Sequence, residues 1–454
     1  MKLGPEQLLT EGKTKQVFDI GNGEVLLRFK DAITAGDGAK KDALKGKGAL
    51  ACQASIAIFE LLNAAGVPTA YLRPGDNPNE MVMKKVDMIE LEVVARRSAH
   101  GSYLQRMPHL EKGQAFPQLL VEFFLKTTGK KWGEIDLPCD DPLIVPHWST
   151  GHVGDLPFWQ LDHSSIMLES MEIFEPKQPW YLKKKIPADL RNNWLPKHAA
   201  EHWCEIDYWT RLIFFIFERA WQLRGFNKAD FKLEFGVTED GRLLLADEVT
   251  ADNWRVTDSE GKYRDKQFYR EGGALDEMLE LYRWTLDEVK SWRIPKSHVL
   301  IWTGSEKDNI DDLGLAFERL TTNPYCERTD WVEMAVLTKS MHKSPVHGTF
   351  GLNKILQRNP ETVVIAFIGR SNGAGPTLSA NCSVPVISVP NGWEKRPEDV
   401  WSSLRTPSMT PASTILDPGN AMLHALQILG RSNPVAYAYA RQIQEQTQSN
   451  FTLL

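Results

Sequence analysis

A glycine between charged residues near the start of the chain could bind phosphate groups. The stretch Glu11-Gly12-Lys13-Thr14-Lys15 lies between two expected strands, so Lys13 and Lys15 flank a tight turn. Glycine lets a backbone approach phosphates closely, and ammonium groups neutralise their charge. These residues suit a nucleoside triphosphate, although a solvated hairpin tip has the same composition. The sequence contains no Walker-type G-x-x-x-x-G-K loop, so an ATP site here would have another architecture.

Two carboxylates further along the chain could hold a metal ion. The stretches 232–236 and 245–248 predict two antiparallel strands joined by a turn. Alternation places Lys232 and Glu234 on one face of the first strand, and Asp247 on the second strand is expected to lie near them. Two carboxylates between apolar strands are costly unless a cation accompanies them, and Mg²⁺ carrying ATP phosphates would fit. A salt-bridged hairpin is the alternative that the spacing leaves open.

Arginines from two separate stretches could hold a second phosphate. Residues 96–102 (RRSAHGS) and 252–255 (DNWR) each combine arginine with small or polar side chains. Planar forks from Arg96 and Arg255, with the hydroxyl of Ser102, would bind a phosphate through charge-assisted hydrogen bonds. Ordinary surface ion pairs explain either stretch taken alone.

Three glycine-bearing polar loops follow expected strands in the last third of the chain, at 304–308, 340–345 and 369–376. Parallel strands bring their carboxyl ends to one sheet edge, so three such loops together favour a ligand site. Backbone N–H groups and hydroxyls there suit a phosphate, and His342 can move protons near neutral pH. A helix cap or an isolated surface histidine is the alternative for each loop alone.

The pattern of the chain changes near residue 295, where a proline ends a helical repeat. Residues 297–454 alternate short apolar runs with helical stretches, which predicts an α/β domain with a parallel sheet covered on both faces. The chain up to 294 is expected to form a small mixed lobe at 1–95 and a large lobe at 96–294, in which helices dominate. A Trp-rich insertion at about 145–200 is expected to pack as extra core or as an interface, with a lid as the alternative.

The composition excludes several classes of protein. The chain has 454 residues, with 53 Lys+Arg and 59 Asp+Glu, so its net charge of −6 gives no reason to expect nucleic acid or an anionic membrane as partner. Its longest dense apolar run, residues 212–217, is far shorter than the about 20 residues of a membrane span. No signal or transit pattern opens the chain, and the five cysteines form no C-x-x-C pair, so we expect a cytoplasmic protein with reduced thiols.

Eight motifs of the first part, in this order, resemble the SAICAR synthetase family: EGKTK, KDAITAGDGA, ELEVVARRSAHGS, VEFFLK, DFKLEFG, LADEV, DNWR and RDKQFYR. The resemblance covers nearly all of residues 1–290 and implies a two-lobed α+β fold related to ATP-grasp and kinase folds. It implies a ligase of purine biosynthesis that depends on ATP and Mg²⁺. In that family ATP activates the carboxylate of carboxyaminoimidazole ribonucleotide (CAIR) as an acyl phosphate, and the amine of L-aspartate displaces phosphate.

The resemblance also implies roles for residues at matching positions. Lys232 would lie beside the reacting phosphates, and Glu234 and Asp247 would hold Mg²⁺. The residues implied at ATP are Lys13, Lys15, Lys84, Lys126, Glu234 and Asp247. The residues implied at CAIR are Asp31, Arg96, Ser102, Asp252, Arg255, Lys266, Gln267 and Arg270.

Residues 297 to about 430 resemble class II AIR carboxylase, the type that is fused to SAICAR synthetase in animals, and WSSLR at 401–405 matches the fused pattern. The resemblance implies a flavodoxin-like lyase domain in which CO2 adds to aminoimidazole ribonucleotide (AIR) without ATP or biotin. It also implies a homo-oligomer, an octamer. His342 would shuttle the ring proton beside Lys343. The residues implied at AIR are Ser305, Asp308, Ser340, Arg370, Ser371, Asn372 and Gly373.

The leading prediction is a bifunctional enzyme that carboxylates AIR and then ligates CAIR to aspartate, with these small molecules as its ligands. Lys307, Met341 and Ser344 stand where the carboxylase family has smaller residues, and we expect Met341 and Ser344 to add bulk beside His342. One alternative is therefore an active ligase whose last domain is a catalytically weakened oligomerisation scaffold. A kinase-like phosphotransferase is another, but no base is placed for its hydroxyl acceptor.

Overall fold

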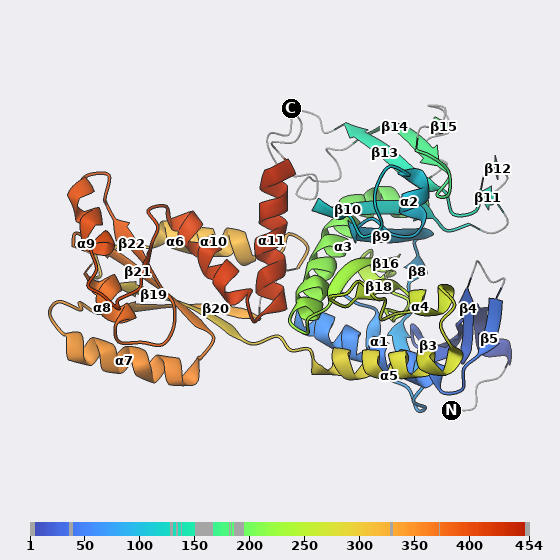
Figure 1. Cartoon of the computed structure of the whole chain (residues 1–454), viewed down its shortest axis with the longest axis horizontal. Coiled ribbons are helices and arrows are strands. Elements are labelled where there is room, and N and C mark those ends of the chain that lie inside the picture. The colour runs from blue at the N-terminus through green and yellow to red at the C-terminus, as the bar shows by residue number, and fades with distance from the viewer. Residues whose placement is uncertain are drawn as a thin grey trace. The chain divides into compact units, whose positions relative to one another are not determined.

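The chain divides into two compact units, which hold Met1–Asn63 with Val67–Trp292 and Ala64–Gly66 with Arg293–Leu454 (Figure 1). The computed structural model describes residues 5–35, 40–127, 130–132, 135–137, 139–149, 167–180, 182, 184–185, 195–326, 330–371 and 373–449. Within these ranges no helix is both long enough and apolar enough to cross a membrane.

The first unit begins with a five-stranded sheet that carries the lysines of the expected ATP site. Its order is β1 (Leu8–Glu11), β2 (Lys15–Gly21), β3 (Glu24–Phe29), β7 (Glu80–Lys84) and β6 (Tyr71–Pro74). All of these pairings are antiparallel, and the pairing of β1 with β2 confirms the two strands expected around the stretch at 11–15. Further elements of this region are η1 (Pro5–Gln7), the hairpin of β4 (Ala32–Ala35) and β5 (Lys40–Ala43), and α1 (Lys47–Ala64).

A nine-stranded antiparallel sheet forms the large lobe. Its main order is β15 (Lys184–Lys185), β14 (Met167–Phe174), β13 (Leu143–Ser149), β10 (Ala115–Leu125), β9 (Leu91–Ser98), β16 (Asn227–Val237) and β17 (Leu243–Ala246). Two short strands, β8 (Asp87–Met88) and β18 (Trp254–Thr257), also pair with β16. The expectation that helices dominate after residue 96 is wrong, because β10 and β16 each form a strand of 11 residues in this part of the chain.

Helix α3 (Ala199–Gln222) packs against this sheet through aromatic side chains. Every side chain from Leu212 to Phe217 is completely buried. The rings of Phe214 and Phe217 lie 5.3 and 5.9 Å from that of Phe231 on β16. Trp221 lies 5.9 Å from the ring of Trp254 on β18, and the tryptophans of α3 belong to the core. The remaining helices of the unit are α2 (Ser102–Arg106), α4 (Gln267–Arg270) and α5 (Leu275–Ser291), and β11 (Lys131–Trp132) pairs with β12 (Ile135–Asp136).

Part of the Trp-rich segment extends the large sheet. β13 and β14 pair from Leu143 opposite Phe174 to Ser149 opposite Met167. Residues 150–166, 181, 183 and 186–194, which are half of the predicted insertion, lie outside the described residues. The described part therefore contributes strands to the sheet of the large lobe.

The second unit contains a parallel sheet in which three strands end at one edge. The sheet order is β20 (Val332–Thr338), β19 (Ser297–Thr303), β21 (Thr362–Gly369), β22 (Val386–Asn391) and β23 (Ser413–Thr414). Thr303 lies opposite Thr338, and Trp302 lies opposite Ala366, so the loops after β19, β20 and β21 begin side by side. This confirms the predicted parallel sheet and the edge at which its polar loops gather.

Helices cover both faces of this sheet (Figure 1). On one face, α7 (Pro345–Arg358) and α8 (Ala374–Ser379) bury Leu352 and Leu378 in a cluster with Trp302. On the other, α10 (Pro418–Leu429) packs on β21 and β22 beside α6 (Asp311–Thr321) and α11 (Pro434–Ser449). The loop helices η6 (Pro397–Val400) and α9 (Trp401–Leu404) complete the unit.

Two glycines of α7 test how tightly this helix packs. A Cβ on Gly348 would overlap the buried Met341 Sδ, whereas a Cβ on Gly351 would meet nothing within 4 Å. Gly348→Ala should lower the free energy of unfolding by about 1–3 kcal/mol through overpacking. Gly351→Ala, the matched control, should raise it by up to about 1 kcal/mol because alanine favours the helix. Calorimetric unfolding of the full chain measures both, and equal shifts of the two variants would contradict the packing described.

Candidate functional site

A cluster of lysines and carboxylates lies where the start of β2 meets the end of β17. Lys15 forms ion pairs with both Asp247 and Glu248. Asp247 follows β17 with φ of +64°, a left-handed conformation that aims its side chain away from the strand. Burial alone would raise the pKa of Asp247, but Lys15, Lys126 and Lys232 hold it below its ordinary value. The structure thus brings together four predicted residues and adds Glu248, which sequence reasoning missed.

Two of these lysines join the cluster through Glu234. Lys126, the residue after β10, forms an ion pair with Glu234. Lys232 Nζ lies 2.6 Å from Glu92 Oε1 and 3.4 Å from Glu234 Oε1. Burial alone would lower the pKa of Lys232, but the carboxylates of Glu92 and Glu234 raise it, so this lysine stays charged. Glu92 was missed because its position beside Lys232 depends on the pairing of β9 with β16.

Two other predicted ATP residues lie apart from these ion pairs. Lys13 is exposed in the turn between β1 and β2. Lys84 Nζ, at the end of β7, lies 4.0 Å from Asp240 Oδ1. Contact of either lysine with ATP stays a prediction.

The cluster offers donors that fit a magnesium ion. Proteins usually hold Mg²⁺ through one or two carboxylates together with substrate phosphates. Glu234 and Asp247 provide such carboxylates, and their lysine partners are cations that phosphate oxygens can share. In the described ranges no three side chains of His, Cys, Asp or Glu converge on one point. The donor set therefore suits a magnesium ion that arrives with a nucleotide.

Five charges that alternate in sign connect α2 to β18 beneath the surface. Arg96 donates from Nε to Glu122 Oε2 at 2.6 Å and from Nη1 to Asp230 Oδ2 at 3.0 Å. Arg255 donates from Nη1 to the same oxygen of Asp230 at 2.6 Å. Arg106 pairs with the other oxygen of Glu122. We call this series the arginine chain; sequence reasoning found Arg96 and Arg255 but neither carboxylate.

Gly101 lets a guanidinium approach the backbone beside Ser102. Its φ is +58°, and a Cβ there would lie only 2.6 Å from Arg255 Nη2. Ser102 follows directly and begins α2. The structure thereby gathers the predicted phosphate residues Arg96, Ser102 and Arg255 around one glycine turn.

Asp252 is enclosed by groups from three different segments. Its Oδ2 lies 2.7 Å from Lys47 Nζ at the start of α1, and its Oδ1 accepts from the hydroxyl of Tyr282 on α5. Lys266 Nζ lies 3.7 Å from Oδ1. Burial alone would raise the pKa of Asp252, but Lys47 and Lys266 hold it far below its ordinary value. The predicted residues Asp252 and Lys266 thus meet, with Lys47 and Tyr282 as partners that the sequence did not reveal.

The other residues predicted at CAIR lie near the same elements. Asp31 accepts from the backbone N–H groups of Gly46 and Gly48 at 3.0 and 2.9 Å, just before and within the first turn of α1. Arg270 donates to Gln267 Oε1 at 3.4 Å within α4, next to Lys266. Their contact with substrate stays a prediction.

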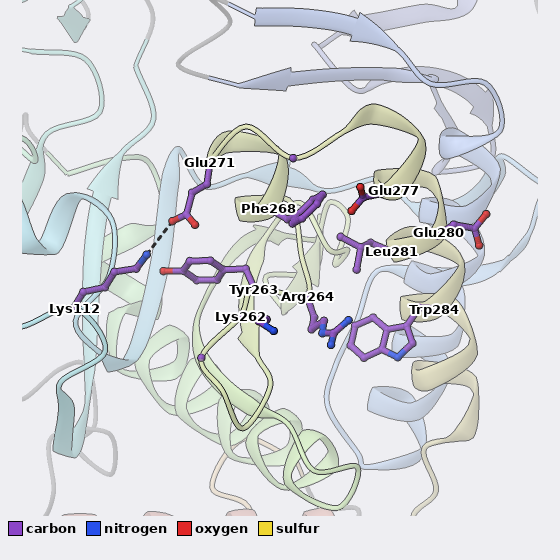
Figure 2. A pocket seen from close by; sticks show the side chains of 12 residues that line it. Lys112, Lys262, Tyr263, Arg264, Phe268, Glu271, Glu277, Glu280, Leu281 and Trp284 are labelled. Carbon is purple, nitrogen blue, oxygen red and sulfur yellow. Dashed lines mark hydrogen bonds and ion pairs between the residues drawn. The ribbon is translucent and has the colours of Figure 1, made fainter.

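A cavity of ≈ 730 Å³ lies beside α4 and α5 (Figure 2). Figure 2 shows Tyr263 between Lys112 and Phe268, with Arg264 beside Trp284. Lys112 Nζ lies 2.9 Å from Glu271 Oε1, and the Tyr263 hydroxyl lies 2.7 Å from His100 Nδ1. None of the predicted site residues lines this cavity.

In the second unit, Asp308 ties two of the predicted loops together. Its Oδ2 accepts from the backbone N–H groups of Gly304 and Ser305 at 2.9 and 3.0 Å. Its Oδ1 accepts from Gly369 N–H at 3.3 Å, across to the loop after β21. Asp308 therefore holds the loop of Ser305 against the strand that leads to Arg370.

His342 meets the loop after β21. A Cβ on Gly373 would lie 3.1 Å from His342 Nε2 and 3.9 Å from Ser371 Oγ, so this glycine leaves the imidazole room. Ser340 Oγ accepts from the backbone N–H of Lys343 at 3.3 Å. Arg370 is exposed at the start of the same loop, with φ of +54°. Asn372 lies outside the described residues.

The expectation that Met341 adds bulk beside His342 is wrong. Met341 is 4% exposed and belongs to the core cluster of Trp302 and Leu352, with its sulfur against Gly348. Ser344 directly precedes α7, where its hydroxyl lies 3.3 Å from His347 Nδ1. Consecutive residues of a turn point in different directions, so the methionine is directed into the core while His342 is exposed.

Comparisons with known proteins identify both parts of the chain. The SAICAR synthetase family model matches residues 8–136 and 163–282, and the AIR carboxylase family model matches residues 322–450. A "Probable multifunctional protein ADE2" of Caenorhabditis elegans is 32% identical, over 98% of this chain and 95% of that protein. A "Bifunctional phosphoribosylaminoimidazole carboxylase/phosphoribosylaminoimidazole succinocarboxamide synthetase" of Drosophila melanogaster is 31% identical, over 97% of this chain and 92% of that protein. A solved "SAICAR synthetase (Type-2) in complex with ADP" is 26% identical, with a TM-score of 0.45, and covers 63% of this chain and 98% of its own.

The matches define a synthetase part followed by a carboxylase part in a single chain. The chain belongs to the family of bifunctional phosphoribosylaminoimidazole carboxylase/phosphoribosylaminoimidazole succinocarboxamide synthetases. The first match is interrupted between 136 and 163, and the unmatched residues include strand β13.

Asp252→Asn tests whether Asp252 neutralises the buried Lys47, which is 1% exposed. The variant should lose about 3 kcal/mol or more of unfolding free energy at pH 7, because a buried charge then lacks its partner. The folded pKa of Asp252 lies below its unfolded value of about 3.9, so this stabilisation is complete above about pH 4 and is lost as the pH falls further. Urea unfolding at pH 7 and pH 3.5 measures the difference between wild type and variant, which should shrink at the lower pH.

Asp258→Asn is the control, because Arg264, the partner of Asp258, is partly exposed to solvent. Exposed pairs contribute at most about 1 kcal/mol, so this control should change little. Equal losses in the two variants would contradict the role given to Asp252.

Proposed function

We propose that the second unit carboxylates AIR to CAIR and that the first unit ligates CAIR to L-aspartate, forming the succinocarboxamide SAICAR. The observation that supports this most directly is the meeting of Lys15, Lys126 and Lys232 with Glu234 and Asp247. Such a cluster suits phosphate transfer, which needs positioning and charge neutralisation more than a nucleophilic side chain. The SAICAR synthetase model matches the first unit and the AIR carboxylase model matches the second, so family membership supports this assignment of the two activities.

In the ligase, a CAIR carboxylate oxygen attacks the γ-phosphorus of ATP, so that an acyl phosphate and ADP form. The aspartate amine then attacks the acyl carbon, phosphate leaves, and the nitrogen loses its proton as the amide forms. Lys15, Lys126 and Lys232 stabilise the charge on the phosphate oxygens. Arg96, Ser102 and Arg255 hold the ribonucleotide phosphate, which fixes the carboxylate relative to ATP.

Glu234 and Asp247 are the residues that would hold Mg²⁺, and a bound ion supplies charge neutralisation to the phosphates. When nucleotide binds, phosphate oxygens replace these carboxylates as the partners of Lys15, Lys126 and Lys232. Because Lys126 and Lys232 are charged before it arrives, these two lysines need no proton transfer to bind phosphate.

In the carboxylase, the nucleophilic imidazole carbon of AIR attacks CO2, a C–C bond forms, and the ring proton then leaves. His342 accepts that proton, since its exposed imidazole can act as a general base. Gly373 and Ser371 border the imidazole, and the Ser305 and Ser340 loops supply donors to the phosphate of AIR. The reaction needs neither ATP nor biotin.

We further propose a cytoplasmic homo-oligomer built on the second unit, and an octamer follows from the resemblance. Val346 and Phe350 on α7 are 77% and 74% exposed, and exposed apolar side chains of this kind support the proposal that another subunit covers this surface. The scaffold alternative was based on crowding at His342, and the burial of Met341 removes that reason.

Asp247→Ala should abolish ATP-dependent SAICAR formation, because Lys15 loses a partner and the nucleotide loses a metal ligand. We expect a loss of at least about 100-fold in kcat/KM, in line with removal of a key charge-stabilising group. The ligase is assayed with CAIR, aspartate and Mg·ATP. ATP-independent carboxylation of AIR by the same variant is the control and should be unchanged. Full ligase activity would contradict the metal assignment.

His342→Asn should have the converse effect. Without the imidazole the ring proton has no acceptor, so AIR carboxylation should fall by about 100-fold or more, a typical contribution of general acid–base catalysis. Ligation of supplied CAIR by this variant should match wild type. Retention of carboxylation would reject His342 as the proton carrier, and loss of both activities would indicate a folding defect instead.

A further inference from the structure

Asp230 lies between the two arginines that are proposed to bind the ribonucleotide phosphate. On β16 it is directly opposite Arg96 of β9 on one side and Arg255 of β18 on the other. Cross-strand neighbours of this kind are close enough for their side chains to interact. Both guanidiniums donate to the same oxygen, Asp230 Oδ2, at 3.0 and 2.6 Å.

The register around Asp230 is specific. A bulge in the pairing of β16 with β18 falls between Lys228 and Asp230. The bulge changes the face that the following residues present to β18, and the pairing after it sets Asp230 opposite Arg255. Lys228 instead lies 4.5 Å above the ring of Trp254, in the aromatic core. Two charged residues of β16 that are close in sequence, Lys228 and Asp230, therefore lie in different surroundings.

The arginine chain carries an excess positive charge. Among the described residues its three guanidiniums, from Arg96, Arg106 and Arg255, form ion pairs with two carboxylates, those of Glu122 and Asp230. Asp265 also lies near Arg255, but burial raises the pKa of its carboxyl to about 7. Buried charges are stable when they are paired, so the unmatched cation favours an added anion. Arg255 Nε is buried without a hydrogen-bond partner among the described residues, which is a second indication of an incomplete site.

The carboxylates leave one end of each arginine available. Arg96 uses Nε and Nη1 toward Glu122 and Asp230, and Arg255 uses Nη1 toward Asp230. Arg255 Nη2 lies against Gly101, the residue before Ser102, and a Cβ on Gly101 would be only 2.6 Å from it. A tetrahedral anion accepts well from such paired, fixed guanidinium edges.

We propose that Asp230 is a positioning residue that holds Arg96 and Arg255 together as one preformed fork for the phosphate of the ribonucleotide. Two guanidiniums repel each other, and a carboxylate shared between them removes that repulsion before substrate arrives. Preorganisation of this kind strengthens binding because less ordering is needed in the complex. The inference rests on the proposed ligase function and extends it to a residue that touches the arginines rather than the substrate.

Asp230→Asn keeps the shape of the side chain and removes its charge. In the full-length enzyme KM for CAIR should rise about tenfold or more, since each pair of charged groups that is lost weakens binding by such a factor. KM for ATP and kcat at saturating CAIR should stay within about twofold of wild type. The phosphate-free ribonucleoside of CAIR should be used equally by variant and wild type, because it makes no contact with the fork.

Asp207→Asn is the matched control. Asp207 is also a buried carboxylate that accepts two bonds from one arginine, Arg211, at 2.7 and 3.1 Å. It lies on α3 outside the proposed site, so its variant should leave both KM values unchanged. Equal effects of the two variants on KM for CAIR, or an equal loss with the ribonucleoside, would overturn the proposal.

Asp230→Glu decides the matter if Asp230→Asn does not fold. The longer side chain keeps the charge but displaces it, so a smaller, equally selective rise in KM for CAIR is expected. Failure of both variants to fold would assign Asp230 to folding and would overturn the proposal.

A binding measurement separates this inference from the proposed function. Ribose 5-phosphate carries the phosphate but cannot react, and calorimetric titration measures its affinity without turnover. Asp230→Asn should weaken its binding about tenfold, as expected for a lost charged partner. A wild type that forms no SAICAR yet shows this difference would reject the ligase function alone. An active wild type whose affinity for ribose 5-phosphate is unaffected by the substitution would reject only the role of Asp230.

Discussion

The carboxylate of Asp230, shared between Arg96 and Arg255, is the interaction on which the first site depends. Guanidiniums cannot be buried alone, because a desolvated charge needs a partner. The antiparallel sheet provides this partner, because Asp230 lies on β16, the strand between those that carry the two arginines. The sheet is fixed in turn by α3, whose aromatic residues pack on the opposite side of β16. Core packing therefore determines where the charges lie.

The two units differ in the partners of their charged side chains. In the first unit, lysines share carboxylates at the start of β2 and the ends of β10 and β17, so cations and acids lie close together. In the second unit, Asp308 accepts only backbone N–H groups and joins two loops, while His342 remains exposed. Phosphoryl transfer needs strong charge neutralisation, whereas carboxylation at carbon needs a positioned ring and a proton acceptor.

Local pattern predicted the second unit better than the large lobe. Short apolar runs separated by polar loops identified β19, β20, β21 and β22, because buried parallel strands are apolar throughout. In the large lobe the long apolar segment at 212–217 is helical, but the surrounding sheet was overlooked in favour of helices. Met341 shows that sequence pattern also fails to predict the direction of a single side chain, since its neighbour His342 is exposed while the methionine lies in the core. The direction of a side chain in a turn depends on the packing around it.

By themselves, the residues determined the chemistry of this protein: lysines and acids suited to a nucleotide, arginines suited to a phosphate, and a histidine beside glycine loops. They also determined that a parallel sheet follows residue 295, because hydrophobic periodicity is local. The tertiary structure alone decided the partners, and it added Glu92, Glu122, Asp230, Glu248 and Lys47 to the candidate sites. These residues are far from their partners in sequence, and strand register and helix packing bring them together. A charged residue acquires its role from the opposite charge that the fold places beside it.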